Sequence, residues 1–278
     1  MTTVNIGTVW DRTSAFLGDH GKALWPIAMG GIALPYAGMT ILAPAAQAAD
    51  TGGKLLINLA VLVLGLVIFW GSLAITAFTL DPPGGRDPAM RLAARRLPLA
   101  IGIGLMIAAG VLVLCVPIGI AMAAGGFDFA AAAAGRHPQM ASGPALAIAV
   151  LYALLLIVAL IWLGARLALT NPVVLIERQG ARSPWRSFQL TRGVALKIVG
   201  VLILYVIVSS VASMAARFVF GSIFALVFVG QGAFSLAAIL TAIVVAMVST
   251  IFSVLAAAFT GKLYLAVRDA REAIVDPR

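Results

Sequence analysis

Apolar residues fall into six long runs, and short polar segments rich in arginine, glycine and proline separate these runs. A helix needs about 20 predominantly apolar residues to cross the hydrocarbon core of a bilayer. Every run is long enough, so the pattern predicts an all-α integral membrane protein with six transmembrane helices. The runs lie near residues 23–48, 55–80, 98–124, 145–169, 195–217 and 233–261.

The runs divide the chain into three parts. Residues 1–22 are predicted to form a cytoplasmic N-terminal interfacial helix, because their apolar residues follow helical spacing. Residues 23–262 form the six-helix transmembrane domain, and residues 263–278 form a cytoplasmic C-terminal tail. The apolar stripe of the first part consists of Ile6, Val9, Trp10, Phe16 and Leu17.

Two parts of the apolar pattern are irregular. The first run is predicted to be bent or broken, because prolines interrupt helical hydrogen bonding. The segment 218–230, FVFGSIFALVFVG, is too short to span a membrane alone. The sequence leaves open whether it extends the fifth helix or lies half-inserted at the outer face. The outer loop at 124–144 is predicted to hold a short helix. The prolines of the first run are Pro26, Pro35 and Pro44.

Two cytoplasmic loops carry helix-start signals of the same kind. Asp87-Pro88 and Ser183-Pro184 each place an N-cap residue before a proline at the first helical position. Together with the N-terminal segment they predict three short interfacial helices, one before each odd-numbered span. The fold is then three repeats of a surface helix plus a hairpin. The positive-inside rule alone also places basic residues before each odd-numbered span, without any repeat. The sequence leaves both explanations open.

Composition agrees with a membrane protein. The chain of 278 residues is 62% hydrophobic and 10% charged, whereas soluble domains carry about 25% charged residues. Its formal net charge of +9 lies beside the apolar runs, which indicates an anionic membrane surface rather than nucleic acid as the partner. Of the 19 basic residues, 16 fall on one side of the six-span topology. The positive-inside rule then predicts a bacterial-type inner membrane protein with both termini in the cytoplasm.

Residues for catalysis or metal binding are not gathered anywhere. The single cysteine, Cys115, lies within an apolar run, and His20 and His137 fall on opposite sides of the predicted membrane. No acidic residue lies in the middle of a span, and no metal-binding or phosphate-binding motif is present. We therefore expect no catalytic residues, no metal and no cofactor. Arg166 and Arg217 lie near predicted span ends, where they can snorkel to the headgroups.

The loop after the fourth span is the most basic part of the chain. Gly180 and Pro184 predict an elbow with a short helix on each side. Its arginines have two explanations, which the sequence leaves open: they fix the orientation of the loop, or they hold anionic lipid headgroups. In the second hypothesis Trp185 anchors the second helix at headgroup level and Glu177 orients one arginine. The four arginines are Arg178, Arg182, Arg186 and Arg192.

The stretch ARLALTNPVVLIERQGARSPWRSFQLTRGVALKIVG resembles the membrane domain associated with glycerophosphoryl diester phosphodiesterases, in the stand-alone form without the catalytic domain. The end of the chain, YLAVRD, is also similar to this family. The resemblance implies a membrane fold without a settled activity, and it does not imply phosphodiester hydrolysis. The resembling positions include Arg166, Pro172, Val173, Glu177, Gly180, Arg186, Ser187, Leu190, Thr191 and Gly193.

These observations favour a non-enzymatic inner-membrane protein that binds or organises lipid, as an accessory subunit of a larger membrane complex or alone. Its expected partners are membrane lipids with anionic headgroups on the cytoplasmic face, together with proteins of such a complex, and not nucleic acid. Two alternatives remain. One is a transporter or channel for a lipid-like or neutral solute, and the other is a membrane-embedded enzyme of lipid metabolism.

Overall fold

The computed structural model describes residues 5–134, 136–137, 139, 142–177, 179–228 and 235–275. This part of the chain is all-α, and it contains six helices that are long and apolar enough to cross a membrane. The elements are α1 (Ile6–Ala28), the π-helical η1 (Met29–Ala33), α2 (Leu34–Ala48), α3 (Thr51–Leu80), α4 (Arg86–Ala124), α5 (Phe129–Ala133), α6 (Gly143–Leu167), α7 (Thr170–Ile176), the 3₁₀ turn η2 (Gly180–Arg182), α8 (Ser183–Leu190), α9 (Ala195–Val227) and α10 (Leu236–Val275).

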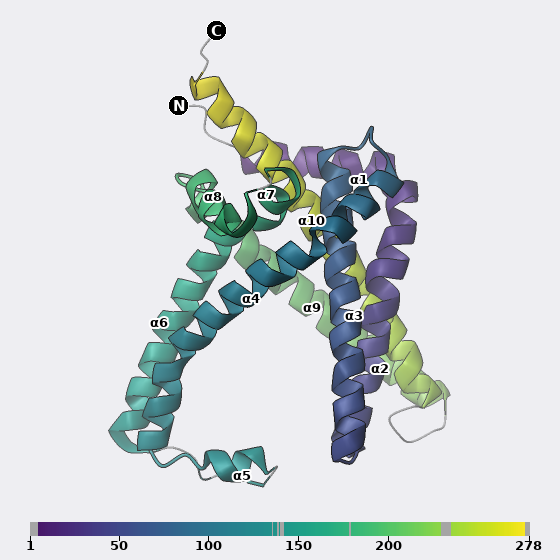
Figure 1. Cartoon of the computed structure of the whole chain (residues 1–278). Coiled ribbons are helices and arrows are strands. Elements are labelled where there is room, and N and C mark those ends of the chain that lie inside the picture. The colour runs from purple at the N-terminus through teal and green to yellow at the C-terminus, as the bar shows by residue number, and fades with distance from the viewer. Residues whose placement is uncertain are drawn as a thin grey trace.

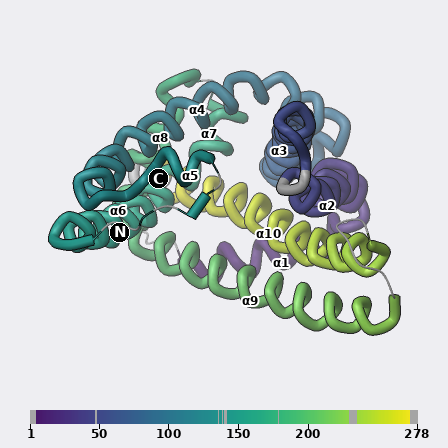
Figure 2. The backbone as a smooth tube through the Cα atoms, turned by 90° about the horizontal axis from the view of Figure 1, so that it is seen from below, coloured from purple at the N-terminus to yellow at the C-terminus, as the bar shows by residue number. Residues whose placement is uncertain are grey.

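The long helices form a bundle with two distinct ends. Figure 1 shows both termini, the turn between α3 and α4, and helices α7 and α8 at one end, which we call the terminal face. The other end, the opposite face, carries α5. Figure 2 views the bundle from below and shows α3 nearly end-on, whereas α9 and α10 run obliquely past it. The segments predicted to share one side of the membrane therefore do lie at one end of the molecule.

The first span is bent, as its prolines predict. Helix α1 lies across the terminal face, and α2 then runs towards the opposite face (Figure 1). Between them the π-helical turn η1 closes with the Leu34 amide donating to the Met29 carbonyl. Pro35 follows at the start of α2, where it has no amide hydrogen to donate. A π-bulge beside a proline is a usual cause of such a kink.

The second predicted interfacial helix is not a separate element. Residues 86–97 are continuous with the third span in α4, through Pro98. The helix also begins earlier than the sequence signal indicates. Gly85, with a φ of 85°, is the N-cap, and Asp87 lies in the first turn rather than at the cap. The repeat of one surface helix plus one hairpin therefore does not hold for the middle unit.

Helix α9 decides between the two readings of segment 218–230. It continues without a break from Ala195 to Val227, so the described part of this segment extends the fifth helix. The predicted short helix of the outer loop is also present as α5, where the Asp128 carboxylate accepts a hydrogen bond of 2.8 Å from the Ala131 amide. Helix α10 similarly continues beyond residue 262, so that residues 263–275 of the predicted tail are helical.

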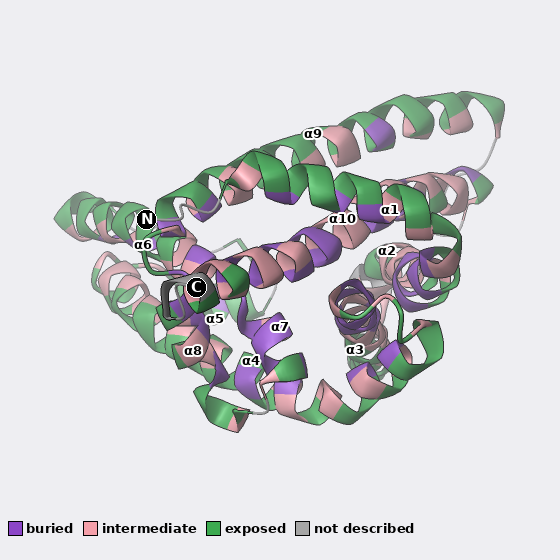
Figure 3. Ribbon diagram, turned by 90° about the horizontal axis from the view of Figure 1, so that it is seen from above, coloured by how far each residue is buried: buried purple, intermediate pink, exposed green. Residues whose placement is uncertain are grey.

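Two apolar clusters lie near the terminal face, and Figure 3, which views the molecule from above, shows buried residues on α7 and α10. One apolar cluster joins α1, the end of α3, the start of α4 and α10. A second cluster joins α1, α6, α7, α8, α9 and α10. At this end η1 and α3 approach so closely that a Cβ atom on Gly71 would lie 2.7 Å from the Gly31 carbonyl oxygen. By contrast, α4, α6 and α9 expose most of their apolar side chains further along their lengths.

Candidate functional site

The arginine-rich loop folds as an elbow, which we define as residues 170–192. Helix α7 and helix α8 are its two arms, and η2 lies between them. Gly180 has a φ of 58°, which glycine adopts readily, and Pro184 occupies the first turn of α8. The same two residues predict this break in the sequence, so the elbow is confirmed.

Glu177 is the centre of the elbow's polar contacts. Its Oε2 accepts hydrogen bonds from Arg186 Nε at 2.8 Å and from Gln179 Nε2 at 3.0 Å. Its Oε1 accepts a bond of 3.0 Å from the buried hydroxyl of Tyr264 on α10. The Glu177 side chain is only 15% exposed. One carboxylate therefore ties α7, α8 and α10 together, and the arginine that it orients is Arg186.

Arg166, at the end of α6, turns towards α8. Its guanidinium carbon lies 5.0 Å from the centre of the Trp162 ring and 4.6 Å from that of Phe188, which is cation–π geometry. Its Nη1 also donates to the Phe188 carbonyl at 3.3 Å. The Ser187 hydroxyl donates in return to the Arg166 carbonyl at 2.8 Å. Arg166 thus fixes α8 against the end of the span instead of only snorkelling past it.

Of the two cation–π contacts of Arg166, the sequence predicts only the one with Trp162. Trp162 and Arg166 are four residues apart, and this spacing places them on one face of a helix. Phe188 comes from a different helix, so no local pattern pairs it with Arg166. The Phe188 ring also stacks on Trp185, with their centres 6.2 Å apart.

Helix α10 closes the elbow from the other side. Arg271 donates from Nη2 to the carbonyl oxygens of Gln189 and Leu190, at the last turn of α8. These carbonyls are among the groups that a helix leaves without an internal partner at its C-terminus. Arg271 thereby holds the end of α8, a role that the sequence analysis missed because the contact spans more than 80 residues.

The remaining predicted residues point outwards. Arg182 and Arg192 are exposed, and their guanidinium groups have no ion-pair partner in the part of the chain that the structure describes. Trp185 is 67% exposed between them. Arg178 lies outside the described residues. The elbow therefore separates its arginines: Arg186 is bound internally, whereas Arg182 and Arg192 are available at the two ends of α8.

No group of three or more histidine, cysteine or acidic side chains within the described ranges is placed to hold a metal ion. His20 stacks on Phe16 in α1, and His137 follows α5 in the chain. Figure 1 shows α1 at the terminal face and α5 at the opposite face. No family model, curated protein or solved structure matches this chain.

Proposed function

We propose that this chain is a non-enzymatic multi-pass membrane protein whose elbow binds anionic lipid headgroups at the terminal face. The observation that carries the proposal is the outer surface of α8. Trp185 in α8 is exposed, and so are Arg182 and Arg192, which flank this helix in sequence and have no acidic partner among the described residues. Tryptophan favours the headgroup level of a bilayer, and arginine forks onto phosphate oxygens.

The spacing of the two arginines sets how many headgroups they take. Nine residues separate Arg182 from Arg192, and α8 occupies most of that interval. At a rise of 1.5 Å per residue they lie about 15 Å apart along the helix. Because their backbones lie that far apart, we propose that each arginine binds a separate headgroup. Arg186 stabilises the elbow through Glu177 and is not the primary ligand.

The proposal places the terminal face in the cytoplasm, because 16 of the 19 basic residues belong to segments on that side. A reporter fused after Arg278 is expected to read as cytoplasmic, and one inserted at Gly135 as periplasmic. The reverse pattern at either position contradicts this orientation. In the reverse orientation the elbow would not face the anionic inner leaflet, which the proposed lipid binding requires.

The test of lipid binding compares matched pairs of substitutions in the purified protein. Arg182→Gln with Arg192→Gln removes both outward charges. Arg182→Lys with Arg192→Lys keeps the charges but removes the two parallel hydrogen bonds that a guanidinium group can donate to phosphate oxygens. Phosphatidylglycerol is titrated into the detergent-solubilised protein, and bound lipid is counted by native mass spectrometry. Each basic residue contributes about 1 kcal/mol near an anionic surface, so the glutamine pair is expected to weaken binding about 30-fold. The affinity of the lysine pair for phosphatidylglycerol is expected to lie between those of the parent and the glutamine pair.

The control is the pair Arg91→Gln with Arg95→Gln, two exposed arginines near the start of α4. This pair removes the same charge from a part of the terminal face that packs beside the elbow, and we expect a smaller loss than in the elbow pair, because it leaves the direct contacts of Arg182 and Arg192 intact. An equal loss in both pairs means that general surface charge holds the lipid. Unchanged binding in the glutamine pair of the elbow means that its arginines serve orientation only.

The resemblance to the membrane domain of the phosphodiesterase family remains a prediction. It supports a membrane protein without hydrolytic activity, since the stand-alone members lack the catalytic domain. The exposed apolar faces of α4 and α6 are also compatible with a subunit of a larger complex. Lipid and protein partners can both cover such faces.

A further inference from the structure

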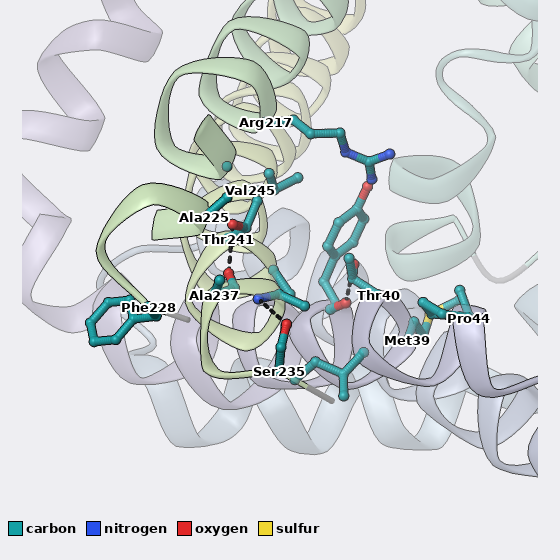
Figure 4. Close-up of a pocket in the computed structure, with 16 residues that line it drawn as sticks. Met39, Thr40, Pro44, Arg217, Ala225, Phe228, Ser235, Ala237, Thr241 and Val245 are labelled. Atoms are coloured by element: carbon teal, nitrogen blue, oxygen red, sulfur yellow. Dashed lines mark hydrogen bonds between the residues drawn. The ribbon is translucent and has the colours of Figure 1, made fainter. Parts of the chain in front are cut away.

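A second site lies outside the elbow, between α2, α9 and α10. These helices line an open cavity of about 1120 Å³. Figure 4 shows Arg217 extending from α9 towards the side of the cavity that carries Met39, Thr40 and Pro44 of α2. Among the described residues that line the cavity, Arg217 is the one charged residue. The cavity therefore combines one cation with a largely apolar lining.

Arg217 is not at the end of its helix, where the sequence analysis placed it. Helix α9 continues for ten further residues to Val227, which is about 15 Å of additional helix. Those residues are almost entirely apolar. A guanidinium group within a membrane-spanning helix is costly unless it faces a partner or a polar cavity. Arg217 is exposed and lines the cavity, so a molecule in the cavity can supply its partner.

The described residues supply no anion to this guanidinium. No carboxylate contacts Arg217 in the described part of the chain, and no acidic residue lines the cavity. The polar groups nearby are hydroxyls. Two of them already donate to their own helices, since Thr40 bonds the Tyr36 carbonyl at 2.9 Å and Thr241 bonds the Ala237 carbonyl at 2.7 Å (Figure 4).

The hydroxyl of Tyr36 also lines the cavity, and it has no hydrogen-bond partner among the described residues. The cavity therefore offers free donors from Arg217 and Tyr36 and no competing acid. A group with several negatively charged oxygens matches that arrangement, because arginine binds such oxygens with two parallel hydrogen bonds.

The rest of the wall selects for a hydrocarbon chain. Met39, Ile41, Phe228 and Val245 line the cavity together with several alanines. Its volume exceeds what an isolated phosphate ion fills. From this combination we propose that the cavity binds an anionic phospholipid of the leaflet at the opposite face, with its phosphate on Arg217 and Tyr36 and its acyl chain against α2 and α10. This site is independent of the lipid binding proposed for α8.

The test uses Arg217→Gln, Arg217→Lys and Tyr36→Phe in the purified full chain. Phosphatidylglycerol, diacylglycerol and inorganic phosphate are titrated separately, with bound species counted by native mass spectrometry. Loss of the charged donor is expected to weaken phosphatidylglycerol binding at least tenfold, or about 1.4 kcal/mol. The lysine variant is expected to lose less, and Tyr36→Phe about threefold. Binding of diacylglycerol, which has no phosphate, is expected to be the same in all variants.

Arg136→Gln is the matched control, because Arg136 is an exposed arginine of the opposite face that is not part of the cavity wall. It is expected to bind phosphatidylglycerol like the parent. Photoactivatable phosphatidylglycerol should label peptides from α2 and α10 in the parent and much less in Arg217→Gln. The proposal is overturned if Arg217→Gln binds the lipid like the parent, or if labelling does not depend on Arg217. Full displacement of the lipid by inorganic phosphate overturns it in favour of a free-anion site.

The two sites can be told apart. The pair Arg182→Gln with Arg192→Gln is expected to leave labelling of α2 and α10 unchanged, and Arg217→Gln is expected to leave lipid binding at α8 unchanged. Loss of both sites in either variant contradicts their independence.

Discussion

The two ends of the bundle are built on different principles. At the terminal face, α1, α7 and α8 pack against the ends of the spans, and apolar clusters, cation–π contacts and a shared carboxylate hold them there. Towards the opposite face, the paired helices α4 and α6 diverge from the other spans, and α4, α6 and α9 leave most of their apolar side chains uncovered. A membrane helix can leave such side chains in lipid, since lipid tails are as apolar as leucine. Contacts within the protein therefore hold the helices in place at the terminal face. Towards the opposite face, the apolar helix surfaces are free to contact lipid or a partner.

The largest expected effect comes from truncating leucines in the two regions. Leu73 is fully buried at the terminal end of α3, and Leu112 is 70% exposed on α4. Leu73→Ala leaves a cavity and is expected to destabilise the fold by about 3 kcal/mol. Leu112→Ala is expected to change stability by less than about 0.5 kcal/mol. Thermal unfolding of both variants in the same detergent measures the difference. Similar losses would mean that the opposite half is packed against a partner.

Glu177→Gln tests the polar side of the same contrast. The substitution keeps the size of the side chain but removes the charge that Arg186 and Tyr264 share. Because hydrogen bonds to charged groups contribute more than neutral ones, we expect a loss of about 2 kcal/mol in unfolding free energy. Asp269→Asn is the control, since this acid pairs with Arg268 at an exposed position and contributes less than about 1 kcal/mol. If the two losses are equal, Glu177 does not organise the elbow.

Replacing two glycines of α3 by alanine is expected to have a smaller effect on the unfolding free energy. The sign of this effect is expected to differ between the packed and the open part of the helix. A Cβ atom on Gly71 would meet the backbone of Gly31, whereas one on Gly65 would meet nothing within 4 Å. Gly71→Ala is therefore expected to destabilise the fold by about 1–2 kcal/mol. Gly65→Ala is expected to stabilise it by about 0.5 kcal/mol, because alanine is the better helix former. Urea or thermal unfolding checks the sign, and destabilisation by both variants contradicts an open outer half.

How far the sequence predicts this structure depends on whether a feature is local. Six spans, the bend near Pro35 and the elbow at Gly180 follow from hydropathy and from residues that break helices. Helix ends are less certain from sequence. Pro98 does not interrupt α4, since a helix that begins upstream can carry a proline when neighbouring groups satisfy the freed carbonyl.

The site was predictable to a similar extent. Arginine density and the Gly180 break locate the elbow, but they do not show which arginine is bound internally. Arg186 is fixed because Glu177 faces it across the turn, and Glu177 is itself held by Tyr264 from a distant helix. The role of Arg217 was missed for another reason. The sequence ends the fifth span at this residue, and only the continuous helix to Val227 shows that Arg217 lies ten residues before the end of α9.

The most direct test of the central claim is hydrogen–deuterium exchange of the unmodified protein in nanodiscs. Discs of phosphatidylcholine alone are compared with discs that also contain phosphatidylglycerol. Lipid bound to the folded elbow suppresses its local opening, so the amides of Ser183–Leu190 are expected to exchange at least about threefold more slowly with the anionic lipid. The amides of α5 are expected to stay unchanged. Equal exchange of α8 in both discs would contradict headgroup binding by the elbow.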